Sequence, residues 1–174
     1  ALVLLAAILT ASATFAQSAK KSIVVYFSWS GVTESVAKEI ASQTGSEIYR
    51  IEEAEPYTRD PKKVRELAQV EKKRNARPAI KGTLPDLSQY DTVYLGWPCW
   101  YSTAPMILFT FLDQVELDGK TLAPFTTSGA TGFGSSPRDI KKVEPKAIQT
   151  KGLSLHSTSG LQKSVADWLS EIKK

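Results

Sequence analysis

The 174-residue chain is poor in the residue types on which disulfide, metal and hydrolase chemistry depend. It has one cysteine, Cys99, so an intrachain disulfide and a CxxC motif are both excluded. It has one histidine, His156, and no Gly-x-Ser-x-Gly segment that would place a nucleophile after a strand. The carboxylates show no metal-ligand spacing, so we expect no metal site. Lysine and arginine are interleaved with acidic residues at a net charge of +4, which does not favour nucleic-acid binding.

Charge is missing altogether from residues 1–16, which are mostly Ala, Leu, Val and Ile. This composition resembles the apolar region of a secretory signal peptide, and it is shorter than the roughly 20 residues of a spanning helix. We therefore expect residues 1–21 to be a leader and linker, followed by a domain over 22–174. The predicted location is the periplasm, with no stable membrane span. A buried N-terminal helix and a cytoplasmic location are the alternatives.

From residue 22 onward, apolar runs alternate with segments of helical periodicity. The run Ser22–Ser28 is nearly all β-branched or aromatic, which is typical of a parallel strand covered on both faces. The predicted strands are 22–28, 47–51, 92–97, 120–127 and 147–155, and the predicted helices are 33–45, 62–74, 106–115, 138–143 and 161–172. No linker or repeat interrupts this order. The sequence therefore predicts a single α/β domain with a doubly wound, five-stranded parallel sheet.

Three unusual segments directly follow the first, third and fourth predicted strands. Ligands of open α/β sheets bind at the carboxyl ends of the strands, so we expect these segments to meet in one site. The candidate site residues are Ser28, Trp29, Ser30, Gly31, Val32 and Thr33, then Pro98, Cys99, Trp100 and Tyr101, then Ser128, Gly129, Gly132, Phe133 and Gly134.

Each segment suits a different part of a phosphorylated ring compound. Three hydroxyls around Gly31 precede a helix, whose N-terminus attracts phosphate, although a simple helix cap is the alternative. Trp100 and Tyr101 can stack on a flat ring, whereas Trp97 is more easily placed in the core. Backbone N–H groups of the glycine-rich third segment can meet ring heteroatoms. This segment superficially resembles a dinucleotide fingerprint, but it follows the fourth strand and soon meets Pro137, so we do not predict an NAD site.

Taken together, these segments resemble the short bacterial flavodoxin-like proteins that bind FMN. The similar stretches are 25–33, 75–78, 84–87, 95–101, 103–105 and 128–136. The resemblance implies a sheet order of 2-1-3-4-5, with FMN beside strands one and three. It implies phosphate contacts from residues 28 and 30–33 and ring contacts from Pro98, Trp100, Tyr101, Ser128, Gly129 and Gly132. The chain departs from the family at Val32, where Asn is frequent, and at Ala130, where Gly is frequent.

The resulting hypothesis is an FMN-bound redox protein that passes electrons to a protein or a small acceptor. An NAD(P)H-dependent quinone or flavin reductase and a flavin-free binding module of the same fold are the alternatives. None of the three segments contains Asp or Glu. Because reduced FMN is anionic, we expect a less negative potential for the second electron than in acidic flavodoxins. The net positive charge suggests an electron partner with an acidic face.

Overall fold

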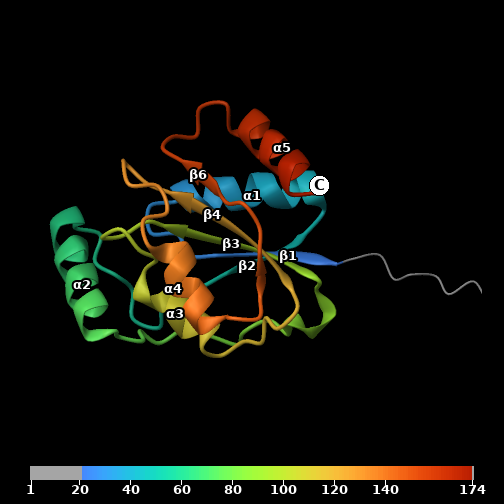
Figure 1. Cartoon of the computed structure of the whole chain (residues 1–174). Helices are drawn as coiled ribbons and strands as arrows, with labels where there is room; N and C mark the ends of the chain where they lie inside the picture. The colour runs from blue at the N-terminus through green and yellow to red at the C-terminus, as the bar shows by residue number, and fades with distance from the viewer. Residues whose placement is uncertain (1–20, 174) are drawn as a thin grey trace, which may run out of the picture.

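The structure of the protein is a computed structural model, which describes residues 21–173 (Figure 1). The leader predicted for the first part of the chain lies outside these residues. The strands are β1 Ser22–Tyr26, β2 Glu47–Arg50, β3 Thr92–Pro98, β4 Thr121–Thr127, β5 Ile148–Gln149 and β6 Leu153–Leu155. The helices are α1 Val32–Thr44, α2 Pro61–Arg74, α3 Met106–Leu112, α4 Ser136–Val143 and α5 Leu161–Ile172, with a short 3₁₀ turn, η1, over Leu87–Gln89.

All strand pairings of the sheet are parallel, and the strand order is β2-β1-β3-β4-β5. This confirms the doubly wound α/β fold and the order 2-1-3-4-5 that the sequence predicts. Val24 lies in register with Ile48 on one side and Tyr94 on the other. The central strands are buried on both faces, which explains why they read as continuous apolar runs.

The fifth position of the sheet is shared by β5 and β6, where the sequence predicts one strand over 147–155. The carbonyl of Leu122 accepts a hydrogen bond from the N–H of Thr150, so the even-numbered residues of β4 face this position. Pro124 is the next residue with that orientation and has no N–H to donate. The ladder is therefore interrupted opposite Pro124, and pairing with β4 resumes in β6.

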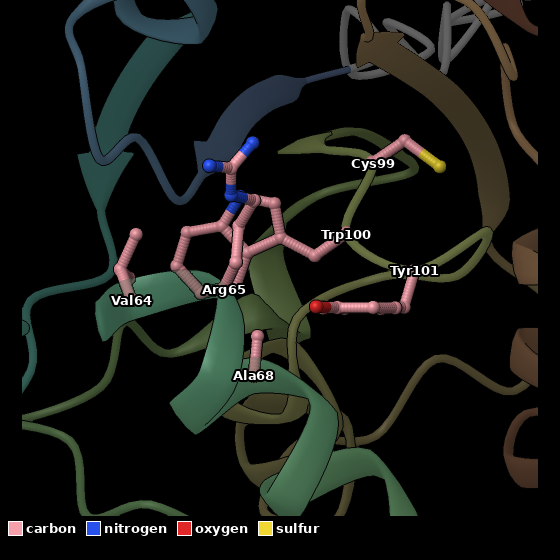
Figure 2. Close-up of a pocket in the computed structure, with 6 residues that line it drawn as sticks. All are labelled: Val64, Arg65, Ala68, Cys99, Trp100 and Tyr101. Atoms are coloured by element: carbon pink, nitrogen blue, oxygen red, sulfur yellow. The ribbon is translucent and has the colours of Figure 1, made fainter. Parts of the chain in front are cut away.

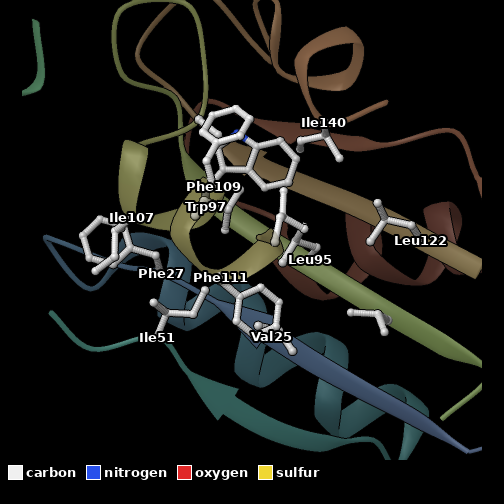
Figure 3. Packing of buried hydrophobic residues seen from close by; sticks show 14 of the residues in the cluster. Val25, Phe27, Ile51, Leu95, Trp97, Ile107, Phe109, Phe111, Leu122 and Ile140 are labelled. Atoms are coloured by element: carbon white, nitrogen blue, oxygen red, sulfur yellow. The ribbon is translucent and has the colours of Figure 1, made fainter. Parts of the chain in front are cut away.

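Two apolar clusters cover the two faces of the sheet. Alternate residues of β1 divide between them: Ile23 and Val25 belong to the cluster under α3 and α4, and Val24 belongs to the cluster under α1 and α5. Figure 3 shows the first cluster, in which Trp97 and Leu95 lie among the side chains of α3. In Figure 1 the same arrangement places α1 and α5 on one side of the sheet and α3 and α4 on the other.

The strands end at one rim of the sheet, where the three predicted site segments leave it. Cys99 extends the pairing of β3 by donating its N–H to the carbonyl of Thr127 at 2.8 Å, and Ser128 donates its N–H to Leu155 at 3.0 Å. The loops that follow β3 and β4 therefore start side by side. Within residues 21–173 no helix combines the length and apolar character needed to cross a membrane.

Candidate functional site

A cavity of about 290 Å³ opens at this rim between the loops that follow β1, β3 and β4. It is lined by Ser30, Val32, Pro98, Cys99, Trp100, Thr127, Ser128, Gly129 and His156. All three predicted segments contribute to this lining. None of the lining residues carries a carboxylate, and the polar ones offer hydroxyl, thiol and imidazole groups.

The loop after β1 leaves a set of unpaired N–H groups at the N-terminus of α1. The buried hydroxyl of Ser28 accepts hydrogen bonds from the N–H groups of Gly31 and Glu34, which fixes the shape of the loop. Gly31 has φ 90°, a conformation that a side chain would disfavour. Within residues 21–173, the N–H groups of Ser30 and residues 32–33 have no acceptor. Free N–H groups at the positive end of a helix form a site for a phosphate.

The acidic side chain nearest to this loop in the sequence is held by two cations. The carboxylate of Glu34 lies 2.6 Å from Lys38 and 2.8 Å from Arg50. The hydrogen bond from Lys38 holds the pKa of Glu34 below its ordinary value, with the charges of Lys38 and Arg50 acting in the same direction. Arg50 also donates to the carbonyl of Ser28 at 3.1 Å. These three groups together carry one net positive charge, which is favourable for an anion at α1.

A buried pair of hydroxyls connects the first loop to the end of β4. The hydroxyl oxygens of Thr33 and Thr127 lie 2.8 Å apart, and both residues are buried. Thr33 therefore holds its loop in place through its side chain, whereas its backbone N–H is one of the unpaired groups at the N-terminus of α1. Thr127 itself lines the cavity.

The loop after β3 forms a tight turn whose two central residues have left-handed backbones. Trp100 and Thr103 exchange two backbone hydrogen bonds, and Tyr101 and Ser102 between them have φ 49° and 60°. Such a turn favours Gly or Asn at both positions, so here it costs about 1–2 kcal/mol per residue. Close packing from the third loop compensates for this strain. A Cβ on Gly134 would lie only 2.2 Å from the carbonyl oxygen of Ser102.

The turn directs Trp100 and Tyr101 toward α2. In Figure 2 both side chains extend to that helix, whereas Cys99 points away from it. They line a second cavity, of about 250 Å³, with Val64, Arg65, Ala68 and Cys99. The indole of Trp100 makes edge-to-face contacts with Phe27 and Tyr57, at centroid distances of 5.7 and 5.4 Å. Trp100 is thus a common wall of both cavities, backed by two aromatic rings.

The loop after β4 is held by the hydroxyl of Ser128 and by the packing of Phe133 against Gly152, the residue before β6. Ser128 accepts a hydrogen bond from the N–H of Gly132 at 2.8 Å, and its carbonyl lies 3.0 Å from Nδ1 of His156. The ring of Phe133 packs edge-to-face on Trp97 at 5.7 Å. It lies so close to Gly152 that a Cβ there would be 2.4 Å from the ring. Ala130 does not have a positive φ, so its departure from Gly introduces no backbone strain.

Comparison with known proteins agrees with this geometry. The family model described as flavodoxin matches residues 21–172, which is nearly the whole chain. The chain belongs to the flavodoxin family. No match was found among curated proteins.

Solved structures related to this flavodoxin include two chains described as flavoproteins. The chain from Bacteroides eggerthii is 35% identical, with a TM-score of 0.79, and the match covers 88% of this chain and 98% of that one. The chain from Bacteroides uniformis is 31% identical, with a TM-score of 0.78 and coverages of 87% and 98%. A flavoprotein from Lactobacillus acidophilus in complex with FMN is 24% identical and shares the fold, with a TM-score of 0.71 and coverages of 90% and 100%.

The predicted residues of this flavodoxin occupy three kinds of position. Seven of them line the cavity between the loops: Ser30, Val32, Pro98, Cys99, Trp100, Ser128 and Gly129. The others shape the loops or pack behind them: Ser28, Trp29, Gly31, Thr33, Gly132, Phe133 and Gly134. Tyr101 is 41% exposed and lines the second cavity.

Three further residues at the site are absent from the sequence-based predictions. They are Arg50, Thr127 and His156. Arg50 and Thr127 are the last residues of β2 and β4, and His156 directly follows β6, so each stands at the rim where the candidate segments were expected. Their position at the strand ends is the only signal in the sequence that points to them, because none of these residues belongs to a glycine-rich, hydroxyl-rich or aromatic segment.

Proposed function

We propose that this flavodoxin binds FMN in the cavity between the three loops. The observation that carries the proposal is that one cavity free of carboxylates joins unpaired N–H groups at α1 to the aromatic and glycine-rich loops. The phosphate would be held by the N–H groups of Ser30 and residues 32–33, and the ring by Pro98, Trp100, Ser128 and Gly129. The FMN complex of the structural neighbour from Lactobacillus acidophilus supports the assignment.

The residues present fit this cofactor in two further ways. A Cβ built on Gly31 or on Gly129 would meet no atom within 4 Å, so both backbones border open space. The hydroxyls of Ser30 and Ser128 suit the polar chain between phosphate and ring. FMN, when bound, supplies reversible transfer of one or two electrons. The protein's own residues bind it, orient its ring between the loops and set the charge around it.

We propose that the protein works as an electron carrier for a protein or a small acceptor. The support is that the cavity behind Trp100, which shares a wall with the proposed FMN site, has a single charged side chain in its lining, Arg65, and so lacks the features of a second nucleotide pocket. The NAD(P)H-dependent reductase stays the alternative function of the same site.

Purification of the full chain provides the test. A yellow protein, or a colourless one that becomes yellow with added FMN in a 1:1 ratio, is the expected result. Bleaching by dithionite but not by NADH or NADPH supports the carrier, whereas NADPH bleaching with quinone turnover supports the reductase. Failure to take up FMN would refute both and leave a binding module of this fold.

The charge around the cavity supports a second proposal, on the reduction potential. No lining residue is acidic, and Glu34 is neutralised by Lys38 and Arg50. An anionic reduced flavin meets less repulsion here than in an acidic pocket. We expect the second one-electron potential to be less negative than in acidic flavodoxins, and spectroelectrochemical titration measures it. A strongly negative value would show that the local charge does not control the potential.

We also propose export from the cytoplasm, on the apolar composition of residues 1–16 alone. Export would separate the protein from cytoplasmic NAD(P)H and so agrees with the carrier function. Cell fractionation, with mass determination of the mature chain, tests this. A full-length protein found only in the cytoplasm would contradict it.

A further inference from the structure

Helix α2 carries an unusual concentration of positive charge on its exposed face. Its six basic residues are all exposed: Lys62, Lys63, Arg65, Lys72, Lys73 and Arg74. Of its two acidic residues, Glu66 is exposed and Glu71 is buried, where it accepts a hydrogen bond from the hydroxyl of Tyr57 at 2.9 Å. The formal charge of the helix is thus six positive minus two negative, or +4, which equals the net charge of the whole chain.

These six cations have no acidic partners within the described part of the protein. Across residues 21–173, nine lysine and arginine side chains outside α2 lie within 4.0 Å of a carboxylate, and none of the six on α2 does. Elsewhere on the described surface, therefore, most of the positive charge is balanced locally, and the cations outside α2 without an ion pair are scattered singly: Lys21, Arg59, Lys120, Lys141 and Lys173. On α2 it is left facing solvent.

The positions of Lys62 and Lys63 work against the stability of the helix. They occupy its first turn, which contains no acidic residue, and the N-terminus of a helix disfavours positive charge by about 0.3–1 kcal/mol per residue. Asp60, which caps the helix by accepting from both of their N–H groups, offsets part of this cost. Helix stability thus gives no reason for these two lysines.

The basic face borders the proposed cofactor site. Arg65 lines the cavity behind Trp100 and Tyr101, and Lys72 donates a hydrogen bond to the carbonyl of Tyr101 at 2.5 Å. Figure 1 shows α2 beside the end of the sheet at which the strands terminate. Between its two basic ends the helix exposes Leu67 and Val70, at 40% and 43%. An apolar centre with charged surroundings is typical of a protein interface.

We propose that the exposed face of α2 is the docking surface for an acidic redox partner protein. This rests on the proposed electron-carrier function, and it places the partner against the loop whose Trp100 also lines the FMN cavity. A membrane surface fits less well, because an interfacial helix inserts its apolar face, and Val64 and Ala68 on that face of α2 are buried against the protein. Complementary charge accelerates association by one to three orders of magnitude at low salt.

The test compares charge reversal on α2 with the same reversal elsewhere. The variant Lys62→Glu/Lys63→Glu places acidic residues in the first turn of α2, where they stabilise the helix. A slower electron transfer in this variant would therefore not be caused by unfolding. The control, Lys151→Glu/Lys163→Glu, makes the same change in net charge on the α5 side of the protein. Stopped-flow measurements follow electron transfer from the dithionite-reduced FMN protein to an acidic b-type cytochrome and to a basic c-type cytochrome, at low and at high salt.

The proposal predicts faster reduction of the acidic cytochrome at low salt, a loss of about tenfold in the α2 variant, and a loss of less than about threefold in the control. Equal losses in both variants, or no preference for the acidic cytochrome, would overturn it. Binding to anionic vesicles or duplex RNA that depends on α2, without that preference, would overturn it in favour of those ligands. If the protein takes up no FMN, the carrier function fails by itself. Calorimetric binding of the oxidised acidic cytochrome, with the same two variants, then decides the docking surface.

Discussion

Two glycines of the loop after β4 should respond in opposite ways to the same substitution. Gly134 packs against the strained turn at Tyr101 and Ser102, and a Cβ on it would overlap the Ser102 carbonyl at 2.2 Å. Gly129 lines the proposed FMN cavity, and a Cβ on it would meet nothing within 4 Å. Gly134→Ala should therefore destabilise the fold. Gly129→Ala should leave the fold intact and weaken cofactor binding.

The loss of folding free energy expected for Gly134→Ala is the sum of three contributions. Its φ of 55° is unfavourable for alanine by about 1–2 kcal/mol. The overlap must push the turn away, which loses the two hydrogen bonds that Ser135 donates to Ser102, at 2.7 and 3.1 Å. At about 1 kcal/mol each, these bring the total to roughly 3–4 kcal/mol. Gly129 has no positive φ and no close neighbour, so its substitution should change stability by less than about 0.5 kcal/mol.

Urea unfolding of the FMN-free protein and fluorescence titration with FMN measure the two effects separately. We expect Gly129→Ala to raise the Kd for FMN about tenfold, equivalent to about 1.4 kcal/mol of lost binding free energy. A Gly134→Ala protein as stable as the parent would show that the turn is not held by this packing. An unchanged Kd in Gly129→Ala would show that the cofactor does not occupy this cavity.

Three further substitutions test other parts of the structure. Burial, followed by the charges of Glu116 and Asp118, raises the pKa of Glu144 to about 7, so the folded protein holds this proton more tightly than the unfolded chain. The contribution of Glu144 to the free energy of unfolding is therefore complete below about pH 4.5 and falls by at most about 3 kcal/mol as pH rises through 7. Urea unfolding at about pH 5 and 8 should show this fall in the parent protein and not in Glu144→Gln. Val32→Asn adds an amide beside the proposed phosphate site and should lower the Kd for FMN about fivefold, whereas an unchanged Kd would place the phosphate elsewhere. His156→Ala removes the hydrogen bond to the carbonyl of Ser128 on the cavity wall and should raise the Kd about fivefold with little change in urea midpoint.

The sheet could be predicted from the sequence because its strands are buried on both faces. Ser22–Tyr26 and Thr92–Pro98 are apolar at nearly every position, and short runs of this kind between helical segments are typical of central parallel strands. The interruption of the fifth strand was missed because its cause lies in another strand. Pro124 was visible in the sequence, but the direction in which its missing N–H faces depends on the register of β4.

The site was predictable at the level of loops but not of individual side chains. That the loops meet follows from the common rim of parallel strands. Which residues of a loop face the cavity depends on the turn geometry, and Tyr101 and Ser102 give no local signal for left-handed backbones. That turn is stabilised by Gly134, more than thirty residues away, so the contact could be found only in three dimensions.

The same turn explains how adjacent aromatic residues can both point to one side. In an extended loop, Trp100 and Tyr101 would point in opposite directions, and only one could face the protein. The left-handed backbone of Tyr101 turns its side chain to the same side as that of Trp100, so both rings reach α2. Trp100 then separates the two cavities. A partner docked on α2 would therefore meet this loop of the proposed cofactor site through the rings of these two residues. The strain in this turn is thus located where the proposed cofactor and the proposed partner come closest.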